Sequence, residues 1–244
     1  MGRLRLRKSF GVRFMSFRKP FLALALAAAP ILVNAAGTAQ IQGGDKNITV
    51  EFDGSFARVQ SDQQKNVHLL ARDNAVYAVT DMGGQPLVVE SSAVIGLLGA
   101  QGMAKLENDK DAIQKFVSLD ATGRNETVAG FQGSVYKLVY TDGNGKRRSE
   151  EAVLGKQPSI VELSQSLGHV AINLMQLAKH DTRGSTELVN ELRKRNLGLL
   201  RFGAKLRLIS LNTAAPNASR FVLPSAPMDL SQGLGGLLQG MGRK

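Results

Sequence analysis

The side chains best suited to acid–base or metal chemistry in this chain are three widely spaced histidines, His68, His169 and His180. None has a carboxylate or a second histidine at the helical spacing that metal ligation uses. His180 follows a long helical pattern, where a cationic side chain would offset the helix dipole. A histidine without a placed partner is weak evidence for a site, so we expect structural roles for all three.

The chain of 244 residues contains no cysteine, which excludes disulfides, thiolate nucleophiles and thiolate metal sites. No nucleophile elbow, Ser-x-x-Lys pair or phosphate-binding glycine loop is present. The sequence therefore predicts a protein that is not an enzyme and that holds no metal or cofactor. A hydrolase assembled from dispersed residues is the remaining catalytic alternative, and it would need a histidine–carboxylate pair.

The run from Asp142 to Lys146 begins like a calcium-binding loop. However, Lys146 stands where a further oxygen ligand is needed, and no glutamate follows at the twelfth position. Asp-Gly and Asn-Gly pairs favour tight hairpin turns. We therefore predict a hairpin that joins strands at 134–140 and 149–154.

The N-terminus has the pattern of a targeting signal. The basic pair Arg18-Lys19 precedes an apolar run at 21–29, and small residues lead up to Ala35. This order predicts a signal peptide at residues 1–35, cleaved after Ala35. The apolar run is too short to cross about 30 Å of hydrocarbon. We expect a periplasmic mature protein that does not span the membrane.

The positive charge of the chain is concentrated in this leader. Seven of the 31 Lys and Arg residues lie within the first 19 positions, so the formal net charge falls from +11 to +4 after cleavage. Only two short basic clusters remain, at 146–148 and 193–195, whereas nucleic-acid binding needs a basic face. We expect no nucleic acid as a partner.

Residues 15–19 form a compact basic region by themselves, so the true start is either Met1 or Met15.

Short apolar–polar alternations separated by turns of two to four residues predict an antiparallel meander in the first half of the chain. The interval 91–116 breaks this rhythm and is predicted to be partly helical. Residues 221–224 are predicted as a last edge strand, and residues 228–244 as a flexible Gly-rich tail. The remaining strands are predicted at 48–52, 56–60, 67–70, 75–79, 87–90, 126–130, 199–202 and 206–211.

The best helix pattern begins at Ser159, which has the capping-box spacing to Glu162. Its apolar residues recur three and four positions apart and share one face. A second helix is predicted at 185–196, with Gly198 as its C-terminal glycine.

The long helix carries the most useful functional signal. Its apolar face must pack on the sheet, and a curved sheet with helices inside it can hold an apolar cavity. The candidate cavity residues are Leu163, Leu167, Leu174 and Met175. The alternative is that these four side chains are ordinary core.

Residues 123–130 (GRNETVAG), followed by 134–138 and the Asp-Gly hairpin, resemble an uncharacterised family of exported bacterial proteins similar to the lipoprotein-carrier (LolA/LolB-like) superfamily. The resemblance implies an α+β fold in which a curved antiparallel sheet forms a half-open β-barrel with helices packed on its concave face. It implies a single domain at residues 36–227. The carriers use such a cavity for acyl chains.

We therefore expect an exported periplasmic, non-enzymatic protein that binds an apolar or lipidated ligand, with a lipid or lipoprotein as partner. The alternative is a structural or stress-sensing interaction module of the envelope, without a lipid ligand. Its envelope protein partner would contact the basic cluster at 193–195 and the C-terminal tail.

Overall fold

The computed structural model describes residues 35–90 and 112–228. Internal contacts divide the chain into residues 1–33 and 34–244, and all described residues belong to the second unit. The predicted signal peptide up to residue 34, the segment 91–111 and the tail from residue 229 lie outside the described residues.

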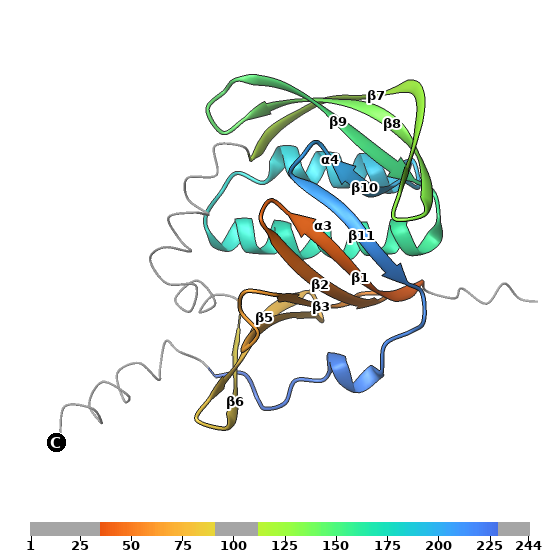
Figure 1. Cartoon of the computed structure of the whole chain (residues 1–244). Coiled ribbons are helices and arrows are strands. Elements are labelled where there is room, and N and C mark those ends of the chain that lie inside the picture. Colours follow the sequence, from red (N-terminus) through yellow and green to blue (C-terminus); the bar gives the residue numbers. More distant parts are fainter. Residues whose placement is uncertain (1–34, 91–111, 229–244) are drawn as a thin grey trace, which may run out of the picture. The chain divides into compact units, whose positions relative to one another are not determined.

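Eleven strands of the described unit form one antiparallel sheet in the order β6-β5-β4-β3-β2-β1-β11-β10-β9-β8-β7 (Figure 1). Two meanders, β1–β6 and β7–β11, therefore meet where β1 pairs with β11, and β6 and β7 are the two edges. The predicted antiparallel sheet is confirmed. The strands are β1 Ala36–Gly43, β2 Lys46–Asp53, β3 Phe56–Ser61, β4 Val67–Arg72, β5 Ala75–Met82, β6 Gln85–Glu90, β7 Ile113–Val128, β8 Phe131–Asp142, β9 Arg147–Gly155, β10 Gly198–Phe202 and β11 Leu206–Asn212.

Alternation along the strands selects the buried face of the sheet. Val50 and Phe52 of β2 are fully buried, and their partners Ala39 in β1 and Ala57 in β3 are buried as well. These side chains belong to core clusters that also include residues of the long helix.

Two helices, α3 Pro158–Leu177 and α4 Arg183–Lys194, connect β9 to β10. α3 packs against β1, β2, β3, β5 and β10, whereas α4 packs against β7 and against α3. In Figure 1 the two helices lie side by side between strands β7–β9 and strands β1–β3. Within the described ranges, no helix is both long enough and apolar enough to cross a membrane.

The start of α3 differs from the prediction. Gln157 is the N-cap residue, its side chain makes no capping hydrogen bond, and Pro158 is the first helical residue. The predicted capping box of Ser159 and Glu162 is therefore wrong. Proline suits the first helical position because its fixed φ is helical and its missing N–H has no partner there anyway.

The end of α4 is set by Asn196, not by Gly198 as predicted. Asn196 has φ +53°, its N–H donates to the Arg193 carbonyl, and the Leu197 N–H donates to the Leu192 carbonyl. This pair of bonds is a Schellman motif. Gly198 instead begins β10, where an added Cβ would collide with the Ile160 carbonyl, so it allows α3 to approach the sheet closely.

Three other predictions are corrected by strand pairing. Residues 113–116, predicted as partly helical, belong to β7, where Ile113 and Phe116 pair with β8. Residues 221–224 form no strand; a 3₁₀ helix, η1 Ala218–Phe221, ends there. β1 was not predicted, because its sequence has few β-branched residues and it is held by partners on both sides.

Candidate functional site

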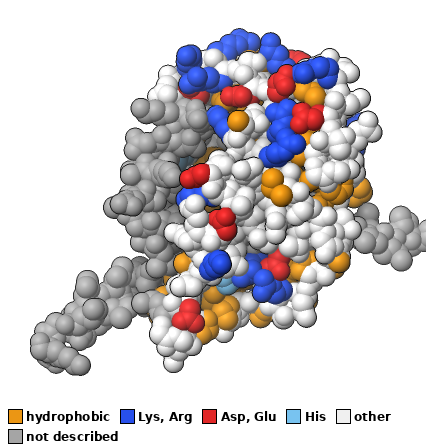
Figure 2. Space-filling model, in the orientation of Figure 1, with side chains coloured by type: hydrophobic (Ala, Val, Ile, Leu, Met, Phe, Trp, Pro, Cys, Tyr) orange, Lys and Arg blue, Asp and Glu red, His pale blue; other side chains and the backbone are white. Residues whose placement is uncertain are grey.

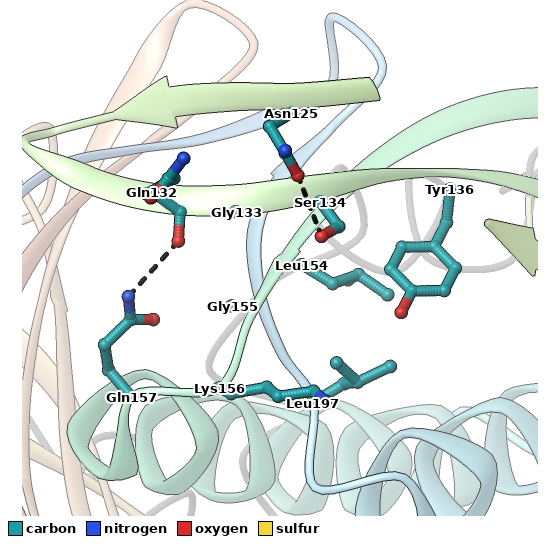
Figure 3. Close-up of a pocket in the computed structure, with 10 residues that line it drawn as sticks. All are labelled: Asn125, Gln132, Gly133, Ser134, Tyr136, Leu154, Gly155, Lys156, Gln157 and Leu197. Atoms are coloured by element: carbon teal, nitrogen blue, oxygen red, sulfur yellow. Dashed lines mark hydrogen bonds between the residues drawn. The ribbon is translucent and has the colours of Figure 1, made fainter. Parts of the chain in front are cut away.

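The described unit contains a pocket of about 290 Å³ between β8, β9 and the start of α3, here called the β8–β9 pocket (Figure 3). Its lining is Asn125, Gln132, Gly133, Ser134, Tyr136, Leu154, Gly155, Lys156, Gln157 and Leu197.

Two hydrogen bonds join polar groups within the wall of this pocket (Figure 3). The Ser134 hydroxyl donates to Asn125 Oδ1 (3.0 Å), and Gln157 Nε2 donates to the Gln132 carbonyl (3.2 Å). Gln157 Oε1 is buried and accepts no hydrogen bond from any described residue. The pocket is thus polar, and Lys156 is the one charged residue among its described lining residues.

A second pocket of about 350 Å³, here called the α3–α4 pocket, lies where α3 and α4 meet the turns after β2 and β4. The turns supply Gly54, Ser55 and Asn74, and the strands supply Ala57 and Ala71. The helices supply Glu162, Gln165, Ser166, His169 and Arg193.

The α3–α4 pocket is more strongly charged than the first. Burial, with a smaller contribution from the nearby Asp53 carboxylate, raises the pKa of the Glu162 carboxyl above its ordinary value. The Ser166 hydroxyl lies 3.5 Å from the Gly54 carbonyl oxygen, and so it joins α3 loosely to the β2–β3 turn. The wall therefore combines a carboxyl, a guanidinium, an imidazole, two hydroxyls and two amides.

Leu163, Leu167 and Leu174 share one side of α3, whereas Met175 follows Leu174 and points to an adjacent side. None of the four residues lines either of these two pockets. Leu163 is 1% exposed and belongs to the core cluster with β1 and β2, against which Leu167 also packs. Leu174 packs, partly exposed, against Ala57, Ala71, Val76 and Val170, and Met175 is also partly exposed.

The three histidines are not brought together. His68 lies in β4, where burial and then the positive charges of Arg58 and Arg220 lower its pKa to about 4. His169 lines the α3–α4 pocket, and His180 follows the C-terminus of α3, where its backbone N–H donates to the Met175 carbonyl. In the described ranges no histidine side chain pairs with a carboxylate, and no three His, Asp or Glu residues cluster as metal ligands do.

The Asp142 run forms the predicted hairpin turn. The buried Asp142 carboxylate accepts backbone N–H groups of Asn144 and Lys146 and the guanidinium of Arg148 (2.7 Å). Hydrogen bonding to Arg148, helped by these N–H groups, lowers the pKa of Asp142. Its oxygens therefore organise the turn between β8 and β9.

An ion cluster that the sequence did not indicate fastens the C-terminal segment to the sheet. Glu51 of β2 accepts hydrogen bonds from Arg58 of β3 (3.0 Å) and from Arg220 of η1 (2.8 and 2.9 Å). Burial raises the pKa of Glu51, but the hydrogen bonds and charges of the two arginines outweigh this effect, and the pKa is lowered overall. Next to the cluster, Phe221 stacks on Phe56 with ring centroids 6.0 Å apart.

We call residues 213–228 the C-terminal strap. Besides the Arg220 and Phe221 contacts, hydrogen bonds and apolar contacts attach this segment to strands β4–β6. Arg72 donates to the Phe221 carbonyl (3.2 Å), and the Met228 N–H donates to the Val88 carbonyl (2.8 Å). Phe221 and Leu223 join a cluster with Leu70, Val79 and Val88. The strap therefore covers apolar residues of the sheet.

A second ion cluster lies on strands β7, β9, β10 and β11. Arg201 donates two hydrogen bonds to Glu126 (2.7 and 3.0 Å), and Arg207 and Arg124 add ion pairs to Glu126 and Glu151 respectively. Figure 2 shows Lys and Arg side chains interspersed with Asp and Glu over the upper strands of the visible face. Charge on this face is therefore mixed, not gathered into one sign.

Comparison with known proteins adds no relative: no protein family, no curated protein and no solved structure shows significant similarity to this chain. Function must therefore be argued from the molecule itself.

Proposed function

We propose that this protein is an exported, non-enzymatic binding protein of the periplasm, which holds an apolar or lipidated ligand in a half-barrel formed by its sheet and helices. The observation that carries the proposal is a change of burial along α3. All buried residues of the helix lie between Ile160 and Val170, and none lies in its last seven positions.

The open half of α3 is still apolar. Leu174 and Met175 are both partly exposed, and Leu174 packs against the buried Ala57 and Ala71 of the sheet. Partly exposed apolar side chains beside an apolar sheet are the kind of surface that an acyl chain covers favourably, at about 25 cal/mol for each Å² removed from water. In this proposal Leu174 and Met175 contact the ligand, whereas Leu163 and Leu167 form the packed base of the site.

The curvature of the sheet is the second element of the proposal. α3 packs against strands of both meanders, β1–β3 and β5 on one side and β10 on the other, while α4 packs on β7. A sheet that bends around both helices would present its concave face to them, as the LolA/LolB-like resemblance implies.

Export agrees with the strand boundaries, because cleavage after Ala35 would leave β1 intact from Ala36.

The first experiment is native mass spectrometry of the protein purified from the periplasm, followed by lipid extraction. We expect co-purifying acyl species, and we expect the delipidated protein to bind a fluorescent fatty acid. The variants Leu174→Gln and Met175→Gln should each weaken that binding several-fold. Ile209→Gln, which changes an exposed apolar residue of β11, is the matched control and should leave binding unchanged.

A ligand-free mass together with no fatty-acid binding would overturn the proposal. The envelope interaction module would then be the better account, and it makes a separate prediction. Deleting residues 228–244 should abolish association with a protein partner in that case, whereas a ligand-binding protein should retain its ligand.

A further inference from the structure

The α3–α4 pocket contains two opposite charges that remain unpaired. Neither the Glu162 carboxylate nor the Arg193 guanidinium makes a hydrogen bond or ion pair with any described residue, including each other. Glu162 is partly buried and loses hydration, which a cationic partner would offset, whereas Arg193 is exposed and accessible to an anion. The arrangement therefore suits a ligand that carries both charges.

A second carboxylate, that of Asp53, lies outside the pocket lining, directly before the lining residue Gly54 in the chain. Asp53 ends β2 and lies close enough to Glu162 to raise the pKa of its carboxyl, and Asp53 makes no ion pair among the described residues. The negative charge of Asp53 adds to that of Glu162 and so favours a cationic group near the Glu162 carboxylate.

The rest of the wall offers hydrogen-bond donors for an anion with several oxygens. The hydroxyls of Ser55 and Ser166 and the amides of Asn74 and Gln165 line the pocket together with Arg193. Guanidinium and hydroxyl donors are common partners of phosphate oxygens. The pocket volume, about 350 Å³, falls in the range of small-molecule sites.

We propose that the α3–α4 pocket binds a zwitterionic group that joins an ammonium to a phosphate, as in phosphoethanolamine. The ammonium lies at Glu162 and the phosphate at Arg193. This inference does not depend on the proposed function, because a soluble zwitterion could occupy the pocket without any acyl chain.

Two sources of this group fit the position of the pocket. Ala57 and Ala71 line it and also pack against Val170 and the partly exposed Leu174. A lipid headgroup in the pocket would thus have apolar surface beside it for its chain. A free phosphorylated amino alcohol would use the polar wall alone.

The test is calorimetric titration of the full chain with phosphoethanolamine. We expect saturable binding, weakened about tenfold or more by Glu162→Gln and by Arg193→Gln, since each removes a hydrogen bond to a charged group. The matched controls are Glu187→Gln and Lys194→Gln, which change helix α4 residues outside the pocket lining and should alter the affinity less than twofold. Circular dichroism checks that every variant is folded.

Absence of saturable binding would overturn the proposal, as would binding that both pocket variants leave unchanged. Titration with lysophosphatidylethanolamine below its micelle concentration separates the two sources. Tighter binding than phosphoethanolamine, reversed by Leu174→Gln, identifies a lipid headgroup. Equal affinity identifies the soluble group. A failure of the acyl-chain proposal would leave phosphoethanolamine binding intact, so the two proposals can be judged separately.

Discussion

Two ion clusters in this protein use the same groups but differ in burial. Glu51 and Arg58 have side chains only 12% and 10% exposed, and Arg220 joins them from a point 169 residues away. In the second cluster the side chain of Glu126 is 33% exposed and that of Arg201 is 16% exposed. Water can solvate the second glutamate when its pair breaks, but it reaches Glu51 and Arg58 poorly. Similar hydrogen bonds should therefore contribute differently to stability.

Glu51→Gln is expected to cause the largest loss in the free energy of unfolding. Removing this carboxylate leaves the Arg58 guanidinium buried without a counter-charge, which typically costs about 3 kcal/mol. Urea unfolding at neutral pH measures the free energy of unfolding. Glu126→Gln is the matched variant in the exposed cluster, and we expect it to cost about 1 kcal/mol or less. Equal losses would show that burial does not distinguish the clusters.

For Arg220→Ala we expect a smaller loss in the free energy of unfolding, together with a local change in the C-terminal strap. Glu51 keeps Arg58 as its partner, and Arg220 is itself 46% exposed, so we expect a loss of about 1 kcal/mol. The strap loses one of its attachment points and should become more sensitive to limited proteolysis between residues 213 and 228. Val222→Ala, which alters an exposed neighbour, is the control. Unchanged cleavage in Arg220→Ala would mean that Phe221 and Met228 suffice to hold the strap.

The pH dependence of stability should also separate the two regions. The pKa of His68 is lowered from 6.5 to about 4, so its neutral form stabilises the fold above pH 6.5, and this contribution is lost as the pH falls toward 4. Glu51 and Glu126 have lowered pKa values, so their contributions disappear only below the ordinary carboxyl value of 4.5. Replacing His68 by Gln should flatten the stability profile between pH 6.5 and 4.5. A profile unchanged by that substitution would contradict this assignment.

The smallest change in the free energy of unfolding is expected for the most exposed ion pair of the second cluster. Arg124 and Glu151 form an ion pair with side chains 60% and 48% exposed. Exposed pairs contribute little because water and salt compete with them, so Arg124→Ala should change the free energy of unfolding by less than about 0.5 kcal/mol. A loss comparable to that of Arg220→Ala would indicate that Arg124 supports the wider network around Arg201.

Local patterns in the sequence predicted the meander, both helices and the β8–β9 hairpin, because alternation, helical periodicity and turn residues are properties of neighbouring positions. β1 escaped prediction because its stability depends on two partner strands. Asn196 was overlooked in favour of Gly198, since glycine is the commoner residue at that position and only the Schellman bonds of Asn196 and Leu197 decide between them.

The candidate site was harder to predict for the same reason. Glu162 and Arg193 lie on different helices, and Gly54 and Asn74 lie on turns from another part of the chain. The Glu51–Arg220 pair joins residues that no spacing rule connects. Glu51 occupies an ordinary polar position in the alternation of β2, between the apolar Val50 and Phe52, so the sequence around it gives no sign of this pair.

The position of β1 has a consequence for the order of folding. This strand is the first of the sheet to be synthesised, yet it lies at the middle of the sheet beside β11, the last. The β1–β6 meander can form from local contacts, but its junction with β11 requires residues more than 160 positions apart, between Thr38 and Asn212. Such distant contacts form slowly. Until β11 is complete, the inner edge of β1 stays open, and the newly made chain remains incompletely folded for that time.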